Sequence, residues 1–253
     1  MIGLSIPYCG PGAVPGAFWG AWNLDPWLLL GLAVLIGGWA RLRGAGGLVP
    51  ADGWFASGWG ALVLAFVSPL CALSAALFAA RIGHHLVLVA VAAPLLALAL
   101  RERVEGWSSR GLPVVPLAAL HAVLFWVWHA PGPYAAAMAS HGVYWLMELS
   151  LLGTALSFWL ACFDRRAGLG VVVPAIVGVM AQMGLLGALL AFARSPLYAP
   201  HELTTWPWGL SPLEDQQLAG LVMWVPGALP YLVAVLMLVA ARLAGPVGGE
   251  WRR

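Results

Sequence analysis

The chain has 253 residues, of which 62% are hydrophobic and only 9% charged, and its mean hydropathy is +0.90. This composition excludes an ordinary soluble globular domain, in which about a quarter of the residues carry charge. The formal net charge is +2. We therefore expect a lipid bilayer to surround the chain, and we expect no nucleic-acid partner.

Seven apolar windows follow one another along the sequence, at residues 26–41, 54–74, 80–100, 113–130, 142–163, 171–193 and 215–242. Each is long enough, or nearly so, to cross a hydrocarbon core of about 30 Å as a helix. The segments between them carry glycine, proline and charge, which commonly end helices. One of these expected loops is "APGPYAAAMAS". The sequence predicts an all-α integral membrane protein, with residues 1–253 forming one polytopic domain as a seven-transmembrane-helix bundle.

The basic residues are all arginines, and their placement predicts a direction. Ten of the twelve fall in alternate connections or at the C-terminus: Arg41, Arg43, Arg101, Arg103, Arg110, Arg165, Arg166, Arg242, Arg252 and Arg253. Because arginine-rich connections stay in the cytoplasm, we predict an N-out, C-in orientation. Arg81 and Arg194 lie toward the other side, at span ends where we expect their side chains to snorkel.

The three cysteines are Cys9, Cys71 and Cys162. They are too few and too scattered to predict a disulfide framework. The first residues lack the basic and apolar regions of a signal peptide, so we expect the mature chain to start at Met1.

Polar residues collect at the predicted outer ends of the spans. His84 and His85 lie one turn inside the third span, and His129 ends the fourth. His141 opens the fifth span, and Glu148 follows two turns deeper. Because neighbours on a helix point about 100° apart, we expect at most one of His84 and His85 to face a given site.

Histidines gathered at one leaflet favour a metal site. Imidazole is the commonest transition-metal ligand, and soft thioether or thiol groups favour Cu(I). The candidate ligands are His85 and His129, then His84 and His141, and more weakly Cys71 and Met147. The sequence predicts copper, although no established metal motif is present.

Glu148 requires a partner, because a charge inside a membrane segment is costly. Arg81 is the natural partner, since it lies at a similar predicted depth. Two interpretations remain for the polar set Arg81, Glu148, Asp215, Gln216 and Gln217. The set is either a structural network that holds helix ends together or a second layer that orients the histidines.

Four stretches carry a resemblance to a known family: "YCGPGAVPGAFWGAWNLDPW", "FVSPLCALSAALFAARIGHHLVLVAVAAPLLALAL", "FWVWHAPGPY" and "LSPLEDQQLAGLVMWVPGALPYL". Together they resemble the multi-span CtaG family of cytochrome c oxidase assembly proteins over nearly the whole chain. The most specific parts are "DQQLAGLVMWVPG" and the surroundings of His85 and His129. The N-terminal stretch is similar to a proteobacterial branch.

The resemblance implies a non-enzymatic factor of the bacterial inner membrane, with a seven-helix fold and cytochrome c oxidase subunits as partners. It implies a role in forming the copper centre of a haem–copper oxidase. We expect ligand exchange of Cu(I) at the periplasmic face, from an exposed and exchangeable site. Cys9 is then either a mobile thiol that captures copper or an incidental residue of a Pro/Gly-rich arm.

The chain departs from the pattern of its relatives at the proposed ligands. Many relatives resemble "HMxQH" where this chain has "RIGHH", so Arg81 replaces a histidine, Ile82 a methionine and His84 a glutamine. Glu148 stands where a histidine is common in the fifth span. These exchanges favour either a rearranged site that uses His84 or a purely structural role for this corner.

Two other functions stay open. One is a metal-free scaffold or oxidase-associated subunit, in which the polar cluster docks a partner. The other is a b-type haem protein with His85 and His129 as opposed ligands. The absence of a nucleophile–base pair at fixed spacing argues against a hydrolase. A small-molecule transporter is also possible, but no pair of broken spans in corresponding halves of the chain points to one.

Overall fold

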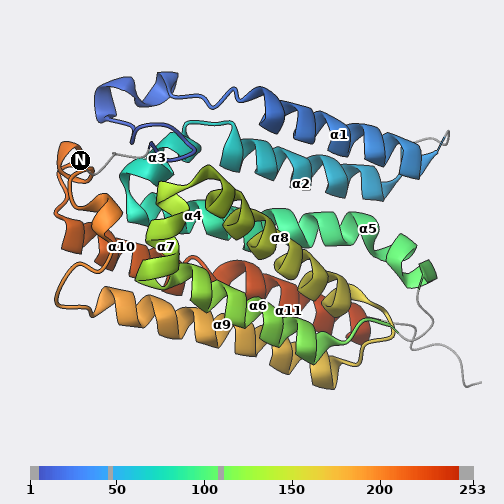
Figure 1. Cartoon of the computed structure of the whole chain (residues 1–253). Helices are drawn as coiled ribbons and strands as arrows, with labels where there is room; N and C mark the ends of the chain where they lie inside the picture. Colours follow the sequence, from blue (N-terminus) through green and yellow to red (C-terminus); the bar gives the residue numbers. More distant parts are fainter. Residues whose placement is uncertain (1–5, 45–47, 108–110, 245–253) are drawn as a thin grey trace, which may run out of the picture.

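A computed structural model of the chain describes residues 6–44, 48–107 and 111–244, which contain helices and no strand. The helices are η1 (Pro15–Gly20), α1 (Pro26–Arg43), α2 (Pro50–Phe66), α3 (Leu70–Ala76), α4 (Phe78–Leu86), η2 (Val87–Ala92), α5 (Ala93–Trp107), α6 (Val114–His129), α7 (Pro131–Ala139), α8 (His141–Phe163), α9 (Leu169–Ala191), η3 (Ala199–His201), η4 (Trp206–Trp208), α10 (Pro212–Trp224) and α11 (Ala228–Leu243). The long helices lie side by side in one bundle (Figure 1).

The helices agree with a membrane protein but give a smaller number of spans than predicted. In the described parts of the chain, four stretches are long and apolar enough to cross a membrane: Phe78–Glu105, His141–Phe163, Leu169–Ala191 and Pro212–Leu243. The number rises to six if each of two bent helix pairs is one span. All seven predicted windows are largely helical, but a total of seven spans is not confirmed, because α1 is outside both sets.

Both bends occur next to proline. α2 and α3 meet at 44°, with Pro69 directly before α3. α6 and α7 meet at 72°, with Pro131 as the first residue of α7. Proline lacks the N–H of the helical ladder and disfavours a helical residue before it, so the chain changes direction at these points.

The segment 131–139 corrects the expectation of a loop, because it forms helix α7. Its prolines lie in the first turn, where a missing N–H costs nothing. Three consecutive alanines follow, and alanine is the best helix former. The expected loop is therefore a short helix packed against α8.

Small residues allow α9 and α10 to lie in backbone contact. A Cβ atom added to Gly187 would lie 2.8 Å from the carbonyl oxygen of Gly220. Glycine at both positions therefore permits this close approach. The packing holds α10 in place, and α10 in turn contacts α4.

Arginines at one end of the bundle link several helices. Arg165 pairs with Glu102 at 3.2 Å, and Arg242 donates hydrogen bonds to the carbonyl oxygens of Arg165 and Ala167. Hydrogen bonds from Arg166 lower the pKa of Asp164 below its usual value. The ends of α5, α8 and α11 are joined by these contacts.

A disulfide lies at the other end, where α3 and the N-terminal arm are found (Figure 1). Cys9 and Cys71 form this bond, with their Cα atoms 5.2 Å apart. The sequence indicates no disulfide framework, so this bond was not predicted. The cause is tertiary: the arm folds back onto α3 across a sequence separation of 62 residues.

Candidate functional site

A buried ion pair lies at the centre of the polar cluster. The Nη1 atom of Arg81, on α4, lies 3.2 Å from the Oε1 atom of Glu148, on α8, and neither side chain is exposed to solvent. The predicted pairing is confirmed. The expectation that Arg81 snorkels was wrong, because its guanidinium points into the bundle rather than toward its end.

Both neighbouring histidines of α4 approach the same carboxylate. His84 Nε2 lies 3.4 Å from Glu148 Oε2, and His85 Nε2 lies 3.4 Å from Oε1. The prediction that only one of them faces a given site was wrong, since each ring approaches a different oxygen. Neither contact has hydrogen-bond geometry, and His84 Nδ1 also lacks a partner. Both imidazole rings therefore lie near Glu148, but their facing nitrogens form no hydrogen bond with its carboxylate.

The helix changes its winding directly after these histidines. Residues Val87–Ala92 form η2, a π-helical segment between α4 and α5. π-Helical turns are rare and occur frequently at functional sites. One turn of this kind displaces α5 around the helix axis relative to the face that carries His84 and His85.

His85 and His129 face one another across α4 and α6. The Nδ1 atom of His85 lies 3.3 Å from the Nε2 atom of His129. Both residues are buried, so the expectation of an exposed site was wrong. The Nδ1 atom of His129 lies 2.6 Å from the carbonyl oxygen of Phe125, which can only accept. His129 therefore carries its proton on Nδ1, and its Nε2 accepts the proton of His85 Nδ1.

With the protons in these positions, the contact between His85 and Glu148 is unfavourable. In a neutral His85 the Nε2 atom is a lone-pair acceptor, and it faces the carboxylate oxygen Glu148 Oε1 at 3.4 Å. Two acceptors in a buried site repel one another. Moving the His85 proton to Nε2 would relieve this contact but would remove the donor to His129.

Asp215 positions α4 rather than contacting the histidines. Its carboxylate accepts hydrogen bonds from the backbone N–H groups of Phe78, at 2.6 Å, and Ala79, at 3.1 Å. These are the first residues of α4, whose N–H groups have no partner within the helix. A carboxylate also interacts favourably with the positive end of the helix dipole.

Gln216 and Gln217 hold the segment that connects α9 to α10. Gln216 accepts from the Leu197 N–H at 2.7 Å, and Gln217 donates to the Ala193 carbonyl at 3.2 Å. Gln216, Gln217 and Asp215 therefore belong to a structural network that holds helix ends together. Arg81 and Glu148 contact the histidines themselves.

Two partners of Arg81 were missed by the sequence analysis. The Sδ atom of Met138 accepts a hydrogen bond from Arg81 Nη2 at 3.5 Å, and the guanidinium lies 5.2 Å from the ring centroid of Tyr144. Tyr144 precedes Glu148 by four residues, a spacing that places both on one helix face and could have been noticed. Met138 had no such signal, because its segment was expected to be a loop.

The remaining candidates lie apart from this cluster or are occupied. His141 is exposed and contacts the Ile6 carbonyl and the ring of Tyr8. Cys71 is bonded to Cys9, so the expectation of a free thiol ligand there was wrong. Met147 is fully buried in the hydrophobic core.

The sequence analysis also missed a second series of hydrogen bonds, centred on His201. The hydroxyl of Tyr134 lies 2.6 Å from His201 Nε2, and His201 Nδ1 donates to the Ala76 carbonyl at 3.2 Å. Burial lowers the pKa of His201 to about 4. Tyr198 donates to the His129 carbonyl at 2.6 Å, so the loop between α9 and α10 is tied to the histidine pair.

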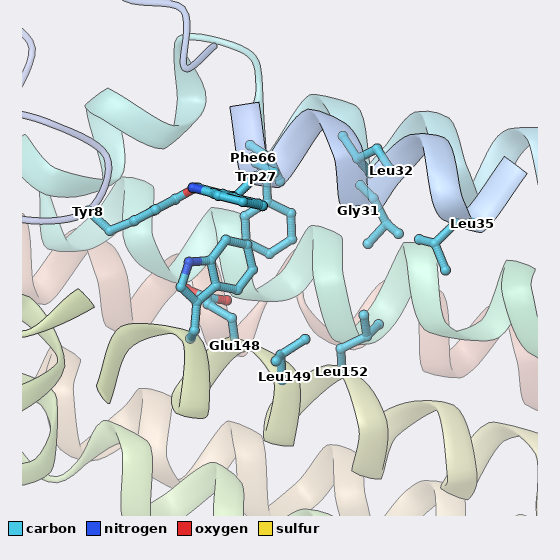
Figure 2. A pocket seen from close by; sticks show the side chains of 12 residues that line it. Tyr8, Trp27, Gly31, Leu32, Leu35, Phe66, Glu148, Leu149 and Leu152 are labelled. Atoms are coloured by element: carbon cyan, nitrogen blue, oxygen red, sulfur yellow. The ribbon is translucent and has the colours of Figure 1, made fainter. Parts of the chain in front are cut away.

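An open-sided cavity of about 390 Å³ lies between α1, α2 and α8. Glu148 forms part of its wall, together with Phe66 of α2 and Trp27 of α1 (Figure 2). Tyr8 of the N-terminal arm lies at the same cavity and donates a hydrogen bond to Asp25 at 2.7 Å. This hydrogen bond lowers the pKa of Asp25. The cavity lies beside the polar cluster, but the Glu148 side chain exposes no surface to it.

The architecture and this cluster can be compared with known proteins. The model of the Caa3_CtaG family, described as cytochrome c oxidase caa3 assembly factor, matches residues 33–244. The chain belongs to the Caa3_CtaG family. No match was found among curated proteins or among solved structures. The family assignment confirms the resemblance found in the sequence, whereas the proteobacterial branch stays a prediction.

The Caa3_CtaG match contains the polar cluster but not the whole disulfide. Arg81, His85, His129 and Glu148 fall inside residues 33–244, whereas Cys9 precedes them. The N-terminal arm that Cys9 anchors therefore lies outside the part of the chain that the family model matches.

The donor atoms in this Caa3_CtaG chain fit a metal only in part. Within the described ranges, no three His, Cys, Asp or Glu side chains are placed to hold a metal ion together. The Arg81 charge already occupies one side of Glu148, which disfavours a second cation there. The facing nitrogens of His85 and His129 are the better pair, since imidazole suits copper.

Proposed function

We propose that this chain helps to assemble a haem–copper cytochrome c oxidase from within the bacterial cytoplasmic membrane, by passing Cu(I) through His85 and His129. The observation that carries the proposal is the contact between these rings at 3.3 Å, in a member of an oxidase assembly family. The partners would be oxidase subunits that receive the ion. The reaction would be ligand exchange, with no enzymatic step.

We propose that the bundle has seven spans, with α1 as the first, and an N-out, C-in orientation. The Cys9–Cys71 bond supports this orientation, because disulfides persist in the periplasm and are rare in the cytosol. The arginines at the opposite end support it as well, by the positive-inside rule. The histidine pair would then lie nearer the periplasmic face.

Cu(I) as cargo requires only a small movement of the rings. Two imidazole nitrogens that share one metal lie roughly 4 Å apart, since each bond is about 2.0 Å. The observed separation is 3.3 Å, and His85 Nδ1 would have to release its proton. The two rings would move apart when Cu(I) binds and return when it leaves. Such a site suits transfer of the ion better than storage.

Copper binding by the purified protein tests the proposal. Protein reconstituted with Cu(I) under reducing conditions is dialysed, and the retained copper is measured by mass spectrometry. We expect about one copper per chain, lost in His85→Ala and in His129→Ala. Oxidase copper content in cells carrying each variant should fall in parallel.

His121→Ala is the matched control. His121 is buried on α6 like His129, but its Nδ1 atom is paired with the Thr154 hydroxyl at 3.1 Å. Copper retention should be unchanged in this variant. Equal retention in His85→Ala, His129→Ala and the unaltered protein would refute the transfer site.

A metal-free scaffold is the second candidate, and Arg81 favours it. A fixed guanidinium beside Glu148 neutralises the cluster without a metal. In that case copper is absent from all samples, while oxidase assembly still depends on the chain. The b-type haem alternative is disfavoured by the direct His85–His129 contact, which leaves no room for a macrocycle between the rings.

A further inference from the structure

Pro94 explains why the chain leaves α-helical winding after the histidines of α4. In an α-helix each N–H donates to the carbonyl four residues earlier, so residue 94 would serve Ala90. Proline has no N–H, and its ring clashes with the carbonyl at that position. The chain instead approaches Pro94 through the wider turn η2, in which the Ala93 N–H donates to the carbonyl of Leu88, five residues earlier.

The same proline leaves the Val89 carbonyl without a helical donor. Its α-helical donor would be Ala93, whose N–H goes to Leu88, and its π-helical donor would be Pro94, which has no N–H. Val89 is buried, so its carbonyl requires a partner within the protein. Trp159 of α8 supplies the donor, because its indole Nε1–H lies 2.9 Å from the Val89 carbonyl oxygen. The indole therefore replaces the backbone donor that Pro94 removes.

Trp159 is enclosed by other side chains. It is buried, and its ring lies 5.4 Å from that of Phe163 and 5.3 Å from that of Tyr231, measured between ring centroids. Glu148 lies on the same face of α8, because residues eleven positions apart on a helix are separated by about three turns. One face of α8 therefore contacts both the π-helical turn and the histidines that precede it.

The winding of η2 sets the rotation of α4 relative to α5. Each residue advances an α-helix by about 100° and about 1.5 Å, so loss of the extra residue in a π turn would rotate one helix against the other by about that amount. α5 packs against α2 and α8, and α4 packs against α10. These contacts cannot all persist after such a rotation. His85, which lies just before the turn, would then move relative to His129 of α6.

We propose that Trp159 is a positioning residue for the histidine pair, because its hydrogen bond to Val89 maintains the π-helical turn that orients α4. The pair depends on this orientation, since His85 Nδ1 must lie within hydrogen-bond distance of His129 Nε2. The consequence for copper rests on the proposed transfer function. The consequence for the histidine contact does not, so the two can be tested separately.

Two variants remove the device from opposite sides. Trp159→Phe keeps an aromatic ring in the site but removes the N–H donor to Val89. Pro94→Ala restores a backbone N–H, and it should remain folded because alanine is the best helix former. A disturbed histidine pair in a variant with an unchanged melting temperature separates positioning from general destabilisation.

Nuclear magnetic resonance of detergent-solubilised protein labelled with nitrogen-15 histidine reports the histidine contact without copper. The hydrogen-bonded Nδ1–H of His85 gives a resonance that is identified by its loss in His129→Ala. We expect this resonance to be lost or shifted in Trp159→Phe and in Pro94→Ala. Copper retention should fall about tenfold or more in both variants, as it does when other residues that orient metal ligands are removed.

Trp59→Phe is the matched control, because Trp59 also donates its indole N–H to a helical carbonyl, that of Leu32, at 3.1 Å. A changed resonance in either test variant with an unchanged control supports the proposal. An unchanged resonance in both Trp159→Phe and Pro94→Ala overturns it, whatever the copper content. An equal change in the control also overturns it, since loss of any interhelical hydrogen bond would then suffice. Absence of copper from the unaltered protein refutes the transfer function alone, and the resonance still decides the role of Trp159.

Discussion

Arg81 and Glu148 are separated by 67 positions in the sequence, yet their charged groups lie 3.2 Å apart with both side chains fully buried. A buried pair of this kind adds little net stability, but removal of one partner leaves an uncompensated charge. Arg81→Met alone or Glu148→Met alone should therefore lower the free energy of unfolding by about 3–5 kcal/mol. The measurement is the unfolding of detergent-solubilised protein in denaturant.

The double variant Arg81→Met/Glu148→Met is the control for this expectation. It removes both charges, so it should be more stable than either single variant. Additive destabilisation in the double variant would contradict a functional ion pair.

Asp215 caps α4 through two backbone N–H groups, and its removal should loosen the helix that carries the histidines. Asp215→Ala should cost about 2 kcal/mol of unfolding free energy, at the upper end for a helix cap, because the site is buried. Thermal unfolding followed by circular dichroism measures the loss. Glu214→Ala, which removes an exposed cap at Ser211, is the comparison and should cost less than about 1 kcal/mol. Equal losses would exclude a special role for Asp215.

The disulfide predicts the number of reactive thiols. Denatured protein treated with maleimide without reductant should gain one adduct, on Cys162, the free cysteine of the described chain. After reduction all three cysteines should react. Mass spectrometry reads both numbers. Three adducts before reduction, in protein prepared without reductant, would argue against the bond.

Stability should decrease in acid because His201 is buried as a neutral ring. Its pKa is lowered to about 4 in the folded chain, against 6.5 in the unfolded chain, so the unfolded state binds the extra proton. The contribution is fully present above about pH 6.5 and is lost as the pH falls toward 4, up to about 3 kcal/mol. Melting temperatures recorded across this window should fall less steeply in His201→Gln. Parallel curves for the two proteins would show that another group controls the acid response.

Depth along a helix was predictable from the sequence, whereas direction around the helix axis was not. Shared depth correctly brought Arg81 to Glu148 and His85 to His129, because a buried charge requires a partner. The expectation for His84 was wrong, since angular spacing on one helix ignores a carboxylate that reaches between two rings. The membrane character and the family could be predicted from composition and short stretches.

Contacts that depend on the path of the chain outside the helices could not be predicted. Cys9 meets Cys71 only because the N-terminal arm folds back over α3. Met138 reaches Arg81 only because residues 131–139 form a helix after a sharp bend. His201 is buried by a connection that hydrophobic periodicity leaves undefined.

The covalent anchor at Cys9 also fixes one wall of the cavity between α1, α2 and α8. The adjacent residue Tyr8 lies in this wall, and the disulfide and the hydrogen bond to Asp25 both hold it in place. The flank formed by α1 has no such tether and exposes much of Trp27 and Leu35. The disulfide therefore makes one wall of the cavity rigid, while the opposite wall is a single exposed helix whose side chains can change rotamer freely.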